Sequence, residues 1–120
     1  MREPEFLLDA ARVVRHAVLE PQGQGYNAIA GDVPVDQENV TALAVVERLV
    51  DGKVFLLHCN GDWETVVATA HDDAAHAERS GRELYAAARQ RWADFRELTP
   101  EEERELISTK TFLTGLVAED

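Results

Sequence analysis

Residues Lys53–Ala70 read KVFLLHCNGDWETVVATA and decide the fold. The first half is a compact apolar run, and the second half is rich in β-branched residues, which favour strands. Between them lies Asn60-Gly61, a dipeptide that accepts the positive φ angles of a type I′ turn. The stretch therefore predicts a β-hairpin. Because its first strand is apolar almost throughout, we expect that strand to be covered on both faces and to lie centrally in a sheet.

Two registers of this hairpin stay open. A two-residue loop would pair Cys59 with Asp62 and His58 with Trp63. A three-residue loop would pair Cys59 with Trp63 instead and move Trp63 to the opposite face. The sequence does not choose between them.

Helical spacing of apolar residues predicts helices before and after the hairpin. The expected helices are Glu5–Glu20, Val35–Val50, Ala74–Leu98 and a last one that begins at Thr99. Asp36 is expected to cap the second helix, and Gly52 to end it in the left-handed conformation. In the third, Gly81 lies on the apolar stripe, which predicts close backbone packing at that position.

The last helix carries the most specific local signature in the chain. Thr99-Pro100-Glu101-Glu102 is a capping box with proline at the first helical position. We expect this helix to run to about Leu106–Leu113, with a terminal strand at Phe112–Val117 as the alternative. A short strand is also expected at Tyr26–Ala30.

These elements predict one α+β domain over residues 1–120, with a β-hairpin, or a three-stranded antiparallel sheet, packed with about four helices. The chain has 120 residues, a length that suits a single domain. A two-stranded hairpin alone is marginally stable, so helices or a second subunit must cover it.

Charge narrows the classes of partner. Twelve Lys and Arg against 23 Asp and Glu give a formal net charge of −11. Nucleic acids and anionic membranes are therefore poor partners, since both are bound through basic side chains. No apolar run approaches the length of a membrane helix, and the start MREPEF does not resemble a signal peptide, so a cytoplasmic location is expected. A single cysteine excludes an internal disulfide.

Catalytic motifs are missing from the sequence. It contains no P-loop, no dinucleotide-binding glycine pattern, no nucleophile elbow and no zinc-protease motif, and we expect no cofactor. His58 and Cys59 are adjacent, but neighbouring strand residues point to opposite faces, so His58 is poorly placed to activate the thiol. Cys59 is expected to be a small buried apolar residue.

One cluster has metal-binding chemistry, namely His71, Asp72 and His76. If the helix has already begun, Asp72 and His76 are four residues apart and share one face, a geometry that can hold a divalent metal or orient a histidine base. The simpler interpretation is that Asp72 or Asp73 caps the helix and His76 faces solvent. His58 is expected on the order of 20 Å away, near the other end of the hairpin.

Two features are candidates for binding a partner protein. Trp63 follows the hairpin turn and can anchor a partner if it lies at the hairpin edge. The acidic residues Glu101, Glu102 and Glu103 favour the start of the last helix through its dipole, and they can also form a docking face for a basic partner. Both features also have structural explanations, as a core tryptophan and as a solvated helix start.

The stretch FLLHCNGDW at 55–63, followed by Ala70-His71-Asp72, resembles a pattern in small uncharacterised bacterial proteins. In that pattern an apolar strand ends in a turn with Cys and Trp, and a second strand ends in His before an alanine-rich helix. The resemblance covers Val54–Ala77. It implies a compact bacterial accessory protein and brings no established activity.

Together these observations favour a small acidic module that binds another protein without catalysis, in the manner of immunity proteins or antitoxins. A basic toxin surface would attract such an acidic cover. The alternative is a small metal- or ligand-binding enzyme that uses His71, Asp72 and His76. A homodimer with a structural interface is the third hypothesis.

Overall fold

The computed structural model describes residues 2–21, 29–30, 33–34, 40–86 and 88–118. In these residues a six-stranded antiparallel sheet, a separate two-stranded ladder and two helices make up the regular structure. The prediction of a hairpin, or three strands, packed with about four helices is therefore wrong. Most of the expected helical sequence forms strands.

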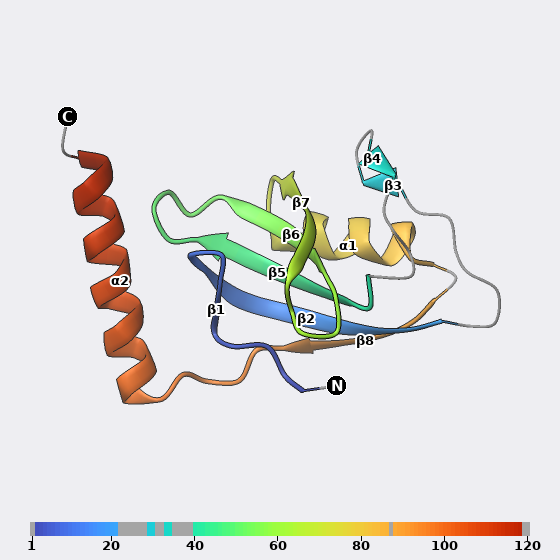
Figure 1. The fold of residues 1–120 in the computed structure, drawn as a ribbon, viewed down its shortest axis with the longest axis horizontal. Coiled ribbons are helices and arrows are strands. Elements are labelled where there is room, and N and C mark those ends of the chain that lie inside the picture. The colour runs from blue at the N-terminus through green and yellow to red at the C-terminus, as the bar shows by residue number, and fades with distance from the viewer. Residues whose placement is uncertain (1, 22–28, 31–32, 35–39, 87, 119–120) are drawn as a thin grey trace.

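In chain order the elements are β1 (Leu7–Leu8), β2 (Ala11–Pro21), β3 (Ile29–Ala30), β4 (Val33–Pro34), β5 (Ala42–Arg48), β6 (Val54–Cys59), β7 (Thr65–His71), α1 (Ala74–Leu84), β8 (Ala88–Asp94) and α2 (Pro100–Ala118). The main sheet runs in the order β1, β2, β5, β6 and β7, and β8 also pairs with β2. Figure 1 shows α1 along the sheet and α2 standing apart from it, beyond the end where β5 turns into β6. The ladder of β3 and β4 is separate, and of the expected strand Tyr26–Ala30 residues 26–28 lie outside the described residues.

Buried residues form one cluster on each face of the sheet. The cluster under α1 contains Ala17, Leu19, Val40, Leu43, Val45, Leu56, Ala77, Tyr85 and Ala88. The cluster on the other face contains Ala11, Val13, Ala42, Ala44, Val46, Leu57, Cys59 and Trp63. The central strands of the sheet therefore contribute to both cores.

The predicted helix Glu5–Glu20 is instead the pair β1 and β2. Burial alternates along β2 at Ala11 and Val13 and again at Ala17 and Leu19, as expected for a strand. Between Val13 and Arg15 the register against β5 shifts by a β-bulge. Because the bulge moves later side chains to the other face, the apolar residues acquire spacings of three and four that imitate a helix.

The predicted helix Val35–Val50 is strand β5 in its described part, and its expected cap Asp36 lies outside the described residues. Ala42–Val46 are all buried, because β5 lies between β2 and β6 and is covered on both faces. A continuous apolar run of this kind does not distinguish a strand from a helix. Gly52 does adopt a positive φ, of 72°, but there it shapes the turn into β6.

The hairpin is confirmed as β6 and β7, and β6 lies between β5 and β7 as predicted for a central strand. Both predicted registers are wrong, because Cys59 pairs with Thr65 and the loop contains residues 60–64. The side-chain oxygen of Asn60 accepts hydrogen bonds from the backbone N–H groups of Asp62 and Glu64. A side chain closes this loop in place of the two-residue turn.

The predicted helix Ala74–Leu98 is helical only as far as Leu84, and Ala88–Asp94 forms strand β8 along β2. The prediction of close packing at Gly81 is confirmed. A Cβ atom there would lie 2.9 Å from Leu43 Cδ1 and 3.2 Å from Trp92 Cζ2. The bare glycine therefore lets α1 approach the sheet.

The last helix is confirmed. The backbone N–H of Glu102 donates to Thr99 Oγ1 at 3.1 Å, and the Glu102 carboxylate accepts from the Thr99 N–H at 2.9 Å. This is the reciprocal capping box that the sequence predicted. The helix continues to Ala118, beyond the predicted end at about Leu106–Leu113, so that end is too early and the alternative of a terminal strand at Phe112–Val117 is wrong.

Candidate functional site

A chain of polar side chains leads from the core to the surface. Tyr85 Oη lies 2.7 Å from His58 Nδ1, and His58 Nε2 lies 3.3 Å from Thr69 Oγ1. Thr69 Oγ1 lies 2.8 Å from His71 Nε2, and His71 Nδ1 lies 2.8 Å from His76 Nδ1. His58 and Tyr85 are fully buried, whereas His76 is exposed. We call these five residues the histidine chain.

Three elements bring the histidine chain together. Thr69 and His71 are two residues apart on β7, so they share the face that α1 covers. His58 lies beside them on β6. Asp73 caps α1 by accepting the backbone N–H of His76 at 2.8 Å, which places His76 in the first helical turn above His71. The sequence prediction that Asp72 or Asp73 caps this helix is confirmed for Asp73.

Burial keeps the inner histidine neutral. Loss of solvent lowers the pKa of His58 from its ordinary value of 6.5 to about 4, and the nearby His71 contributes in the same direction. The pKa of His71 is also lowered, mainly by burial and then by His76. At neutral pH both rings therefore offer one N–H donor and one lone pair.

The hydrogen bonds of the histidine chain can run in either of two directions, with each group donating to its outer neighbour or to its inner neighbour. In the outward direction, Tyr85 donates to His58 Nδ1, and each following group donates to the next as far as His76 Nδ1. In the inward direction every donor and acceptor is exchanged, and His76 Nδ1–H donates to His71. Each neutral ring contributes one donor and one acceptor in both cases. Neither direction needs a charged group in the core.

The expected distance between His58 and His71 is wrong. The sequence placed them on the order of 20 Å apart, but a single hydroxyl group, Thr69 Oγ1, bridges the two rings. His58 pairs with Val67, so His71 follows its partner by only four residues. The bulge between His58 and Cys59 accounts for part of this shift.

Of the predicted metal cluster, the structure brings His71 and His76 together and leaves Asp72 apart. Asp72 precedes the cap residue and is exposed, so it does not share a helical face with His76. Within the described ranges, no set of three His, Cys, Asp or Glu side chains is arranged to hold a metal. The two histidines are in direct contact, with ring centroids 5.0 Å apart.

Cys59 lies on the other face of the sheet from His58, as predicted. It belongs to the cluster around Trp63, whereas His58 contacts Tyr85 on the side of α1. Burial raises the pKa of the Cys59 thiol to about 12, with a further contribution from Asp9. The thiol is therefore protonated and inert in the folded protein.

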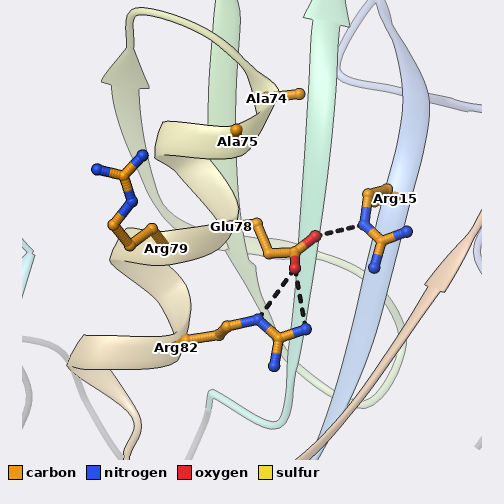
Figure 2. Close-up of a pocket in the computed structure, with 6 residues that line it drawn as sticks. All are labelled: Arg15, Ala74, Ala75, Glu78, Arg79 and Arg82. Atoms are coloured by element: carbon orange, nitrogen blue, oxygen red, sulfur yellow. Dashed lines mark hydrogen bonds and ion pairs between the residues drawn. The ribbon is translucent and has the colours of Figure 1, made fainter.

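A hollow with a volume of about 420 Å³ lies between α1 and β2 and is lined by arginines. Figure 2 shows Arg15 and Arg82 pointing toward Glu78, while Arg79 turns away from it. Arg15 also contacts Asp94 on β8, at 2.5 Å. The carboxylates thus neutralise much of the guanidinium charge in this hollow.

The partner-binding candidates occupy different environments. Trp63 is only 5% exposed, and its indole N–H donates to the Arg2 carbonyl at 2.8 Å. Its ring packs edge-on against His16, so Trp63 fills the second core and is not displayed at the hairpin edge. Of the three glutamates, Glu101 and Glu103 are exposed.

Glu102 differs from its two neighbours because it is engaged within the protein. Its carboxylate pairs with Arg96 and accepts the Thr99 N–H, and these contacts lower its pKa to about 2. Only the flanking glutamates remain free of such contacts on the described surface. Of the three glutamates predicted as a docking face, Glu102 is therefore already engaged within the protein.

Sequence reasoning missed Tyr85, Thr69 and Arg15 as members of polar clusters. The alternation of Thr69 and His71 in β7 is visible in the sequence and places them on one face. Nothing local indicates that Tyr85, 27 residues after His58, returns to its ring. That contact depends on how α1 crosses the sheet.

In comparisons with known proteins, no family model, no curated protein and no solved structure matches the chain. The resemblance of Val54–Ala77 to small bacterial proteins stays a prediction. Among the described residues, no helix is both long enough and apolar enough to cross a membrane.

Proposed function

We propose that this protein is a non-enzymatic interaction module that binds a basic protein through α2. One observation carries the proposal. Ile107 and Phe112 on α2 are 65% and 66% exposed, which sets them apart from the buried apolar side chains of the sheet. Because five residues separate them, they lie on different sides of α2, and a helix with large apolar side chains on more than one side is normally covered.

The position of α2 leaves this surface free. Figure 1 shows the helix standing apart from the sheet. Leu106 and Lys110 line a shallow hollow together with Leu49 and Gly52 at the turn after β5, and α2 is not among the main packing partners of any strand. Since Leu106 is half-buried toward this turn while Ile107 points elsewhere, α2 has apolar residues on more than one side. Helices of that kind are normally covered.

Charge indicates the class of partner. Glu101, Glu103 and Glu105 are exposed in the first turns of α2, and the whole chain carries a net charge of −11. A partner with an apolar groove and a basic rim would complement both features and would be attracted over a distance. A second copy of this chain would bring two anionic surfaces together, which is unfavourable. An immunity-like or antitoxin-like neutraliser of a basic protein fits this chemistry.

The proposal includes a cytoplasmic location, which is compatible with a single buried free thiol at Cys59. It extends the acidic surface predicted from the sequence by adding the apolar residues of α2. Trp63 does not belong to this surface, because it lies in the core.

Site-specific photocrosslinking tests the proposal. A photoreactive amino acid replaces the exposed Thr111, which lies between Ile107 and Phe112, and crosslinked products from the native host are identified by mass spectrometry. The identified protein is then purified and titrated. We expect a basic protein whose affinity falls with salt and is lost in the double variant Ile107→Ser, Phe112→Ser.

The control variant is Val66→Ser, which removes an exposed apolar side chain on β7 and should leave binding unchanged. Crosslinks only to a second copy, together with a dimeric mass in light scattering, would instead support the homodimer. Equal affinity of the double variant and the wild type would refute a role of α2.

A second candidate is a metal- or ligand-binding enzyme that uses His71 and His76, the pair that remains of the predicted cluster. The observation that favours it is the direct contact of the two rings, with Nδ1 atoms 2.8 Å apart. Arg79 lies one turn after His76 on α1 and lines the arginine hollow, so an anionic substrate would suit this surface. Metal-dependent hydrolysis of anionic esters that survives His76→Ala would exclude this candidate.

A further inference from the structure

The geometry points to a two-histidine site for a divalent transition metal ion, held between His71 Nδ1 and His76 Nδ1. The inference is independent of the proposed role of α2; it rests on the histidine pair of the second candidate function and names the class of metal that this pair would bind. It rests on the direct contact of two imidazole nitrogens at the surface and on the polar chain behind them.

The two nitrogens are already directed at each other. Their separation of 2.8 Å is that of a hydrogen bond, so one shared proton lies between two nitrogen atoms. A tetrahedral zinc ion with bonds of about 2.0–2.1 Å needs its two nitrogen ligands about 3.3 Å apart. Opening the pair by about 0.5 Å is a small rotation for two side chains at the edge of the molecule.

Different elements hold the two ligands in place. His71 ends β7 and is half-buried, and His76 belongs to the first turn of α1, where the Asp73 cap fixes its backbone N–H. The pair therefore spans the junction between strand and helix and does not depend on one helical face.

Thr69 supplies the outer partner that a ligating histidine needs. A metal-bound histidine nearly always donates its other ring N–H to a hydrogen-bond acceptor, which fixes its orientation. Here His71 Nε2 lies 2.8 Å from Thr69 Oγ1. Thr69 is thus a positioning residue, and its hydroxyl is held in turn by the buried His58.

Metal binding selects one of the two directions of the histidine chain. With both Nδ1 lone pairs on the metal, the shared proton leaves the space between the rings: His76 carries its proton on Nε2, and His71 carries its own on Nε2 and donates to Thr69. Thr69 then donates to His58 Nε2, and the His58 proton resides on Nδ1, facing Tyr85 Oη. No proton is gained or lost, because each neutral ring changes only its tautomer. The tautomer of the buried His58 is therefore fixed when the surface site holds a metal ion.

The ligand class follows from the donor atoms. Imidazole nitrogen suits zinc, nickel and copper, whereas magnesium and calcium prefer oxygen. Because no third His, Cys, Asp or Glu side chain completes the set in the described part of the chain, water fills the other positions. The site is therefore open to an incoming ligand.

Calorimetric titration with zinc chloride at pH 7.5 tests the inference on the full chain without a purification tag. We expect one zinc ion per chain and no heat from magnesium chloride. His71→Ala and His76→Ala should each lower the affinity by on the order of tenfold or more, with an unchanged circular dichroism spectrum. His16→Gln is the matched control, since His16 lies on the other face of the sheet beside Trp63.

Two further measurements separate a built site from loose binding to surface histidines. Thr69→Val should weaken zinc binding by about 10- to 100-fold, and Thr69→Ser should restore it. Nitrogen-15 spectra of the zinc-loaded protein should show His58 protonated on Nδ1. Wild-type affinity in His71→Ala, or in Thr69→Val, would overturn the inference, and so would zinc-loaded His58 protonated on Nε2.

Discussion

Acid should destabilise this protein through His58, in a pH range above that in which most carboxylates titrate. The pKa of His58 is lowered from 6.5 to about 4 by burial, and the side chain is fully buried. Between pH 6.5 and about pH 4, His58 binds a proton in the unfolded chain but not in the folded protein. The free energy of unfolding therefore falls as the pH falls. A pKa difference of about 2.5, at about 1.36 kcal/mol each, gives a loss of about 3.4 kcal/mol.

Urea unfolding measured at intervals from pH 7.5 to pH 4 checks this value. The non-titrating variant His58→Asn should start less stable at pH 7, because it loses contacts with Tyr85 and Thr69, and should then show a much flatter curve. His76→Asn leaves His58 buried and should keep the steep fall. Parallel curves for the wild type and His58→Asn between pH 6.5 and pH 4 would show that burial does not hold this ring neutral.

Three other substitutions or reactions probe separate parts of the molecule. Gly81→Ala should destabilise the protein by about 1 kcal/mol in urea unfolding. The added methyl group would lie 2.9 Å from Leu43 Cδ1, and such overpacking costs about 1–3 kcal/mol, which exceeds the helix-propensity gain of about 1 kcal/mol. A variant more stable than the wild type would contradict the close packing. The Cys59 thiol, whose pKa is raised to about 12 by burial, should react with a thiol reagent at pH 8 only after unfolding, and fast reaction of the native protein would contradict its burial. Thr99→Ala should lower the stability of α2 by about 1 kcal/mol and reduce the helical circular dichroism signal, because the cap is lost. Thr99→Ser keeps the hydroxyl group and should change neither. In both variants the unfolding midpoint of the sheet should stay the same.

Local signals in the sequence predicted the elements that depend on local interactions. The capping box at Thr99 satisfies backbone donors within one helical turn, so the start of α2 is visible without any knowledge of the fold. The apolar and β-branched runs on either side of Asn60 likewise predicted β6 and β7. Only the details of the loop differ, because the Asn60 side chain bonds to backbone groups up to four residues away.

The strands that were predicted as helices have tertiary causes. In β2 the bulge after Val13 interrupts the alternation at Arg15, so the next buried residue is Ala17, four positions on, which imitates one helical turn. In β5, burial on both faces removes the alternation that identifies a strand at the surface of a sheet. The position of the bulge in β2 and the neighbours of β5 both depend on the order of strands in the sheet, and a single sequence does not show that order.

The candidate site was predicted in part. His71 and His76 were named from the sequence, although five residues do not separate neighbours on a helix face. They meet because one belongs to a strand and the other to the helix that follows it. The link to His58 and Tyr85 was not predicted, since it depends on the hairpin register and on the path of α1 over the sheet.

The pairing of β2 with β8 has a consequence for how the chain acquires its structure. The pairs range from Pro21 with Ala88 to Arg15 with Asp94, so the contacts join segments that are far apart in the sequence. On the ribosome β2 emerges long before its partner, so one of its edges stays unpaired until Ala88–Asp94 has been synthesised. Such distant contacts make folding slow, and the nascent chain is exposed to aggregation during that delay.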